Sequence, residues 1–355
     1  MKTYQFSDLE NKITSLCEGS FDRACHLEDV QMTISHNYEG REFDYVRLSD
    51  MWGTLNRTSS PDYGVSHTAM KSVCHRINFP YKFWAHLDFV GECVSRNQLA
   101  NNLLTNSDDD VLLRFNSERN IYGVNSLHYE RINHDFVWSL LANNEVMSDF
   151  NIVDMNVTHD YLSVKVISKN VQEVDDVGVG FIITNSMSGL RALEIKCFVF
   201  VLACSNGMIV SQGSLGDIVR RVHKGSKLSI GAQEPPNYRD PKFWQISDLV
   251  GNQIMYARSR NFKGIVIDKI SKAMETPILE EKDTDKVKNI LNLTEKEKAH
   301  YNKSLHNNLP QHGRTLWGYV QAATEMAHLP PFEGTPRQEE IEQDAWRALE
   351  KLSVS

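Results

Sequence analysis

The sequence has no long hydrophobic run, and this absence excludes a membrane-spanning helix. Its longest uninterrupted apolar stretch extends from Cys197 to Cys204, whereas a spanning helix needs roughly 20 apolar residues. The N-terminal stretch MKTYQFSDLENK carries acidic and polar side chains, where a secretory signal would have an apolar segment of roughly 7 to 15 residues. We therefore expect a cytoplasmic protein that does not associate with membranes.

Paired cysteine motifs are also absent. The chain contains 6 cysteines without a Cys-x-x-Cys pair, and they lie beside apolar residues, as reduced thiols of a protein core do. The cysteines are Cys17, Cys25, Cys74, Cys93, Cys197 and Cys204. Cys74 and His75 are adjacent, so on a helix they point in different directions and cannot easily share a tetrahedral metal. We expect a buried cysteine beside a surface histidine there, and no metal site in the chain.

The chain lacks the motifs that hold nucleotides or carry out common hydrolytic reactions. It has no Gly-Lys-Ser or Gly-Lys-Thr, which a phosphate-binding loop requires. The stretch from Lys224 to Lys227 is interpreted instead as a basic turn after a helix. Gly178 and Gly180 lie within a strand pattern, which favours a bulge or close strand packing over a dinucleotide site. The His-Glu-x-x-His and Gly-x-Ser-x-Gly motifs are absent too. We therefore expect no cofactor, and an enzyme would need a dispersed carboxylate site assembled only by the fold.

Proline and glycine are scarce, with 10 and 19 in 355 residues, and they fall singly at expected turns. Hydrophobic residues make up 41% of the chain and charged residues 24%, which is typical of a globular protein. A chain of this length holds about two domains. We expect an N-terminal arm over residues 1–44, an α+β core domain over 45–275 and a helical C-terminal region over 276–355.

Periodicity predicts an α+β fold, with a central antiparallel β-sheet, packed helices and a helical C-terminal region. Short segments rich in Val, Ile and Phe, bounded by Asn, Asp, Gly or Ser, indicate strands joined by tight turns. Strands are expected at 30–34, 111–115, 121–127, 153–157, 161–167, 178–184 and 193–203. Ser66 caps a helix that Pro80 breaks, which predicts two short helices. Further helices are expected at 92–104, 133–141, 215–223, 240–274, 284–291, 294–305, 314–329 and 337–352.

Positive charge is concentrated in one part of an acidic chain. Residues 181–270 hold 12 Lys or Arg and 6 Asp or Glu, a net charge of +6, although the whole chain has −8. Cations among aromatic side chains suit single-stranded nucleic acid, because the charge neutralises phosphate and the rings stack on bases. The candidate contacts are Arg191, Lys196, Arg220, Arg221, Lys224, Lys227, Arg239, Lys242, Arg258 and Arg260, with the aromatic residues Tyr238, Trp244 and Tyr256. Solvated basic helix faces with buried aromatics would produce the same pattern, so this alternative stays open.

Four stretches of the chain carry a family resemblance. They are residues 69–87, Leu113-Arg114 with 122–132, 185–193 with 204–208, and 313–327. Together they resemble the family called domain of unknown function 932, which is found in phages and plasmids. The third stretch is the most specific, and its motif residues are Asn185, Gly189, Cys204, Asn206 and Gly207. Asn185 and Gly189 tolerate positive φ, and Asn206 with Gly207 suits a tight turn. The motif therefore fits two turns beside a sheet as well as it fits a functional site.

The resemblance implies work on mobile DNA but supplies no reaction. Antiparallel strands followed by a long helix, without an ATP site, also resemble the layout of phage single-strand annealing proteins. The first hypothesis is therefore a phage- or plasmid-encoded single-stranded DNA-binding protein that promotes ATP-independent annealing as a homo-oligomer, in the cytoplasm of a bacterial host. It requires the basic side chains to lie on one continuous groove. The alternative is a noncatalytic phage protein that binds a host or viral protein, in which the basic residues scatter or are covered by the acidic helices after residue 275.

Overall fold

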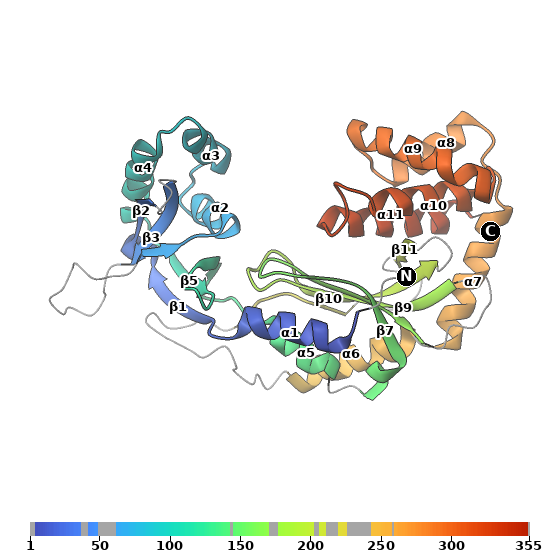
Figure 1. The fold of residues 1–355 in the computed structure, drawn as a ribbon, viewed down its shortest axis with the longest axis horizontal. Helices are drawn as coiled ribbons and strands as arrows, with labels where there is room; N and C mark the ends of the chain where they lie inside the picture. The colour runs from blue at the N-terminus through green and yellow to red at the C-terminus, as the bar shows by residue number, and fades with distance from the viewer. Residues whose placement is uncertain are drawn as a thin grey trace.

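The computed structural model describes residues 4–36, 42–48, 62–142, 145–169, 177–201, 206–210, 219–225, 243–257 and 259–353. Figure 1 shows two bodies, a smaller N-terminal lobe and a main body built on a larger β-sheet. Helix α1 (Phe6–Cys17) packs into the core of the main body. The chain then enters the lobe at strand β1 (Phe21–His26) and returns to the main body at helix α5 (His134–Ala142).

The lobe combines two antiparallel three-stranded sheets, in the orders β1-β5-β6 and β2-β3-β4, with three helices. Its elements after β1 are β2 (Val30–His36), β3 (Glu42–Leu48), β4 (Asp62–Gly64), α2 (His67–Arg76), α3 (Tyr81–Phe89), α4 (Cys93–Thr105), β5 (Asp110–Phe115) and β6 (Ile121–Ser126). The side chain of Ser66 accepts a hydrogen bond from the Ala69 amide and caps α2, and α3 begins after Pro80. The predicted pair of short helices is therefore confirmed. Cys74 is buried and His75 is exposed, also as predicted.

The main sheet is antiparallel throughout and has the order β11-β10-β9-β8-β7, with β12 also paired to β10. Its strands are β7 (Phe150–Val157), β8 (Leu162–Ser168), β9 (Val177–Asn185), β10 (Leu193–Val201), β11 (Asn206–Ile209) and β12 (Val219–Arg221). Helices α1, α5 and α6 (Phe243–Ala257) lie along one face of this sheet, and the last two helices, over residues 316–327 and 336–352, lie along the other (Figure 1). Apolar side chains from both sets of helices join those of the sheet in one large core.

The C-terminal region is helical, as predicted. Its helices are α7 (Arg260–Glu275), α8 (Glu281–Ile290), α9 (Glu295–His312), α10 (Leu316–Ala327) and α11 (Pro336–Leu352). Thr294 and Glu297 form a reciprocal capping box that starts α9, a pair that satisfies two backbone amides at once. The predicted α+β class with a central antiparallel sheet is confirmed. The domain boundaries predicted at residues 44 and 275 stay predictions.

Three local predictions are wrong. The helix expected at 215–223 is strand β12 where the structure describes it, because this segment pairs with the start of β10. The helix expected at 240–274 is two helices, since the side chain of Ser259 accepts from the Phe262 amide and caps a new one. Asn206 and Gly207 form no tight turn. They belong to β11, and a Cβ at Gly207 would lie 2.2 Å from the Phe198 ring, so only glycine fits.

The predicted close strand packing is confirmed at Gly180, whereas a Cβ at Gly178 would make only ordinary contacts, the nearest at 3.6 Å. A Cβ at Gly180 would lie 1.9 Å from the carbonyl oxygen of Val166 on the neighbouring strand. Backbone atoms cannot yield as a flexible side chain does, so any other residue would push β8 and β9 apart. This glycine therefore allows β8 and β9 to pair closely.

Candidate functional site

A buried arginine joins the lobe to the main body. Arg114 of β5 is 1% exposed, and its guanidinium carbon lies 5.4 Å from the ring centre of Tyr122 and 5.3 Å from that of Tyr129. Tyr122 stacks on His159 with ring centres 4.4 Å apart, and Tyr129 stacks on His223 at 4.8 Å. A cation is attracted to the face of an aromatic ring. These five side chains, here named the Arg114 cluster, therefore bring together segments far apart in the chain.

Hydrogen bonds compensate the buried charge of Arg114. Its Nε donates to Asp22 Oδ1 at 3.0 Å, one terminal nitrogen donates to Asn133 Oδ1 at 2.5 Å, and the other donates to the carbonyl oxygen of Met187. Asp22 is itself buried, and its second carboxylate oxygen lies 3.6 Å from Arg131. A buried charge is tolerated only when it is paired and hydrogen-bonded in this way. Arg114 thus ties β1 to the main body through one side chain.

The turn that receives this contact links β9 to β10 over residues 186–192. The Tyr129 hydroxyl lies within hydrogen-bond distance of the carbonyl oxygens of Ser186 and Met187, and Asn125 Nδ2 donates to Ser188 O at 2.9 Å. The amides of Met187 and Ser188 both donate to the His159 carbonyl. Side chains and backbone from the lobe and from the β7–β8 turn therefore fix the backbone of this turn in place.

Two residues of the predicted family motif belong to this junction. Gly189 has φ +89°, as expected, and a Cβ there would lie 2.3 Å from Asn125 Nδ2. Asn185 is fully buried, ends β9 and donates through Nδ2 to the carbonyl oxygen of Ile132 at 2.7 Å. Its backbone belongs to the strand, so the tolerance for positive φ that the sequence suggested is not used. Asn185 contributes a buried amide that connects β9 to the start of α5.

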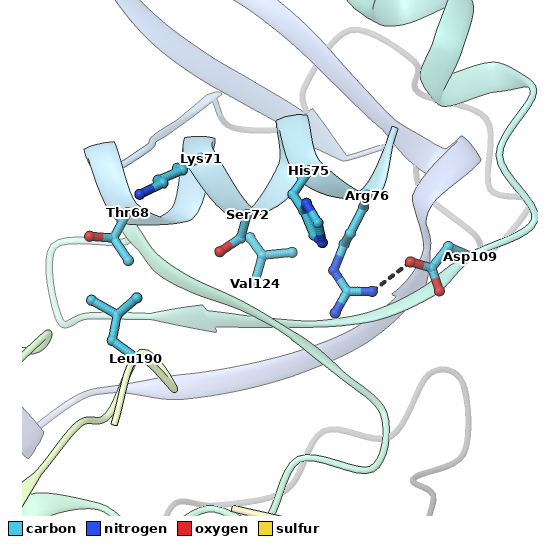
Figure 2. Close-up of a pocket in the computed structure, with 8 residues that line it drawn as sticks. All are labelled: Thr68, Lys71, Ser72, His75, Arg76, Asp109, Val124 and Leu190. Atoms are coloured by element: carbon cyan, nitrogen blue, oxygen red, sulfur yellow. Dashed lines mark hydrogen bonds and ion pairs between the residues drawn. The ribbon is translucent and has the colours of Figure 1, made fainter. Parts of the chain in front are cut away.

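An open groove of about 620 Å³ lies beside this turn. Its lining side chains are Thr68, Lys71, Ser72, His75 and Arg76 of α2, Asp109 before β5, Val124 of β6 and Leu190 of the β9–β10 turn (Figure 2). The spacing of three or four residues places the α2 side chains on one helical face. Lys71 and His75 are exposed, while Arg76 pairs with Asp109 at 2.5 Å. The groove therefore has a cationic, hydroxyl-bearing wall facing an apolar wall.

The described part of the predicted basic segment does not form one surface. Lys196 of β10 and Arg220 of β12 both pair with Glu194, each at 2.8 Å. Arg221 is the next residue along the strand, so its side chain points to the opposite face, where it makes a two-pronged pair with Glu130 of the lobe. Carboxylates of this chain thus already neutralise three of the predicted phosphate contacts.

The remaining predicted residues differ in their surroundings. Arg191 pairs with Glu339 of α11 at 2.9 Å and lies over the Tyr161 ring, with 25% of its side chain exposed. Lys224 and Arg260 are exposed, and Tyr256 packs partly buried against the main core. Lys227, Tyr238, Arg239, Lys242, Arg258 and Cys204 lie outside the described residues, as do the side chains of Trp244 and Asn206. The nucleic-acid contacts in this segment stay predictions.

A buried ion pair fastens α11 to the main sheet. Lys165 of β8 is 2% exposed, and its ammonium lies 2.7 Å from the carboxylate of Glu342, which has no exposed surface. Burial alone lowers the pKa of Lys165, but the carboxylates of Glu342 and Asp154 outweigh that effect and raise the pKa. The ammonium therefore stays charged. Glu339, three residues earlier on α11, accepts from the hydroxyls of Tyr161 and Ser163.

Sequence reasoning missed Arg114 and Lys165 as key residues, although a signal exists. Each is a single cation inside an apolar strand pattern, VLLRF and LSVKVIS. Charged residues are rarely fully buried unless they are paired. A lone cation in such a run therefore indicates a buried ion pair, but its partner lies 92 residues away for Arg114 and 177 residues away for Lys165.

Buried histidines give the junction a predicted pH dependence. Burial lowers the pKa of His134 to about 3 and that of His223 to about 4. The unfolded chain takes up these protons near pH 6.5 while the native rings stay neutral, so stability falls as the pH drops from 6.5 towards 4. We expect each ring to lower the free energy of unfolding by about 2 kcal/mol between pH 7 and pH 5. Urea unfolding at both pH values measures this change.

A stacking replacement provides the control for this pH effect. His223→Phe keeps a ring against Tyr129 but cannot be protonated. The difference in unfolding free energy between pH 7 and pH 5 should shrink by about 2 kcal/mol in this variant. An unchanged difference would show that His223 takes up its proton equally in the folded and unfolded chains.

No protein-family model matches the sequence, and searches of the curated proteins and of the solved structures also gave no match. Within the described segments, no group of three or more His, Cys, Asp or Glu side chains could hold a metal ion. No helix in the same segments has both the length and the apolar character needed to cross a bilayer. The family resemblance stays a prediction.

Proposed function

We propose that this protein binds single-stranded nucleic acid in the groove between α2 and the β9–β10 turn. The observation that carries the proposal is the pairing of two unlike walls, with Lys71 and His75 on one and Leu190 on the other. A single strand has the matching halves, because its phosphates need cations and its unstacked bases offer apolar faces. The volume of the groove falls in the range that ligand sites occupy.

The rest of the functional proposal follows the sequence analysis. The protein would be encoded by a phage or plasmid and act in the bacterial cytoplasm, where it would anneal strands without ATP as a homo-oligomer. The exposed cations Lys224 and Arg260 would contact phosphates beyond the groove. The excess of acidic residues in the rest of the chain directs a polyanion towards its few cationic faces and limits nonspecific adhesion.

Fluorescence anisotropy of a labelled oligo-dT, titrated with the protein at several salt concentrations, tests the proposal. Replacing both Lys71 and His75 by Ala removes one ammonium and one imidazole from α2 without touching the Arg76–Asp109 pair. We expect binding about tenfold weaker, the loss of roughly one charge-assisted contact. The log-log salt slope should also fall in magnitude by about 0.7 for each phosphate contact removed.

Two further variants locate the binding surface. Lys303→Ala removes an exposed cation from α9, remote in the fold from α2 (Figure 1), and should leave affinity and slope unchanged. A variant with Arg220, Arg221, Lys224 and Lys227 all replaced by Ala tests the segment predicted from sequence. If the variant with four substitutions loses binding while the Lys71 and His75 double variant keeps it, the groove is not the site. If wild-type protein leaves the oligonucleotide free at low salt, the proposed function is wrong.

One observation favours a protein partner as the second candidate function. Helices α3 and α4 expose the large apolar side chains Phe83, Val94 and Leu99, at 46%, 64% and 44% of their surface. Exposed apolar patches are one mark of a protein–protein interaction site. A negative oligonucleotide titration would therefore direct the search to a host or viral protein that binds the lobe.

A further inference from the structure

We infer that Leu190 makes the groove selective for unpaired bases, by packing its side chain on the face of a base whose phosphate lies on α2. This inference rests on the proposed function and names the strand that the site accepts. Leu190 is 59% exposed, and Figure 2 shows it rising from the β9–β10 turn towards the helix. An exposed leucine alone is ordinary. What distinguishes this one is the structure that holds it.

The turn beneath Leu190 is fixed by buried polar contacts at nearly every residue. The carbonyl oxygen of Met187 accepts from Arg114, and that of Ser188 accepts from Asn125. The amide of Leu190 itself donates to the Ser186 hydroxyl at 3.0 Å. Met187 and Ser188 are buried, so their carbonyl oxygens need hydrogen-bond donors, and here side chains of distant segments supply them. These contacts remove the freedom that an exposed loop tip normally has, so the leucine is presented at a fixed place.

Fixed presentation matters because ordering a loop during binding weakens affinity. With a rigid apolar side chain opposite a cationic helix face, one nucleotide can place its base on the side chain and its phosphate on the helix at the same time. Val124 of β6 also lines the groove, but it is 4% exposed, so Leu190 is the apolar side chain that a base can reach. In a duplex the base faces are already covered by their stacked neighbours, so they cannot reach Leu190. The geometry therefore favours single strands over duplexes at equal phosphate charge.

The test compares Leu190→Ala with wild type on two single strands, an oligo-dT and an abasic strand of equal length, by fluorescence anisotropy. Removing the side chain should weaken oligo-dT binding about five- to tenfold, near the lower end of the range for aromatic side chains that stack on bases, because leucine offers a smaller surface. Affinity for the abasic strand should not change, since its phosphates remain. Leu190→Trp should bind oligo-dT more tightly than wild type, with the new indole fluorescence quenched by the bases.

Leu279→Ala is the matched control, because Leu279 is 69% exposed between α7 and α8, far from the groove in the fold. If wild type binds oligo-dT but Leu190→Ala binds it equally well, the inference is overturned while the proposed function stands. Equal losses on both strands would also overturn it, since the leucine would then only shape the turn. If wild type binds neither strand, the proposed function fails and this inference with it.

Discussion

Arg114→Met is expected to lower the free energy of unfolding by about 3–5 kcal/mol, the effect of removing one partner from a buried ion pair. Methionine fills much of the same volume but leaves the Asp22 carboxylate buried, with Arg131 3.6 Å away as its remaining cation. The side chain of Asn133 also loses its donor, and the carbonyl oxygen of Met187 keeps only the Tyr129 hydroxyl. Urea denaturation followed by circular dichroism measures the change.

A second substitution separates lost pairing from lost volume. Asp22→Asn combined with Arg114→Met removes both charges and keeps similar shapes, so it should recover part of the stability lost in the single variant. Lys82→Met, an exposed change on α3 of the same lobe, should stay within about 0.5 kcal/mol of wild type. A loss below about 1 kcal/mol for Arg114→Met would show that the junction does not depend on this cation.

The features that could be predicted from sequence are those set by near neighbours in the chain. Ser66 and Pro80 mark the start of one helix and the break before the next, and both signals act within a few residues. The apolar strand patterns placed β5, β8 and β9 to within one or two residues. The burial of Cys74 and the exposure of His75 followed from the angle between adjacent side chains on a helix.

What could not be predicted depends on partners far along the chain. Residues 219–221 become a strand because β10 offers them a free edge, and nothing in their own sequence encodes that edge. Arg191 pairs with Glu339, which α11 brings to it from 148 residues away. The groove has the same origin, since α2 and Leu190 are adjacent only in the fold. Local propensity is weak against such tertiary contacts.

The second large effect is expected at the pair that fastens α11. Lys165→Met should destabilise the protein by about 3–5 kcal/mol, because it leaves the fully buried Glu342 carboxylate without its ammonium partner. Glu342→Gln should cost less, since the new amide oxygen can still accept from Gln338, which lies 3.0 Å from the carboxylate. Urea unfolding of both single variants and of the double variant gives the coupling energy between the two side chains.

A double variant decides whether the charge pair of Lys165 and Glu342 or the packing around it holds α11 on the sheet. With both charges removed, Lys165→Met with Glu342→Gln should recover most of the loss, because replacing a buried pair is often neutral. The exposed pair of Lys272 and Asp268 on α7 is the matched control, and Lys272→Met with Asp268→Asn should show little coupling. If the double variant is as unstable as Lys165→Met alone, the unpaired Glu342 carboxylate is not the cause of the loss. The packing of the lysine side chain, and not its charge pairing, would then hold α11 on the sheet.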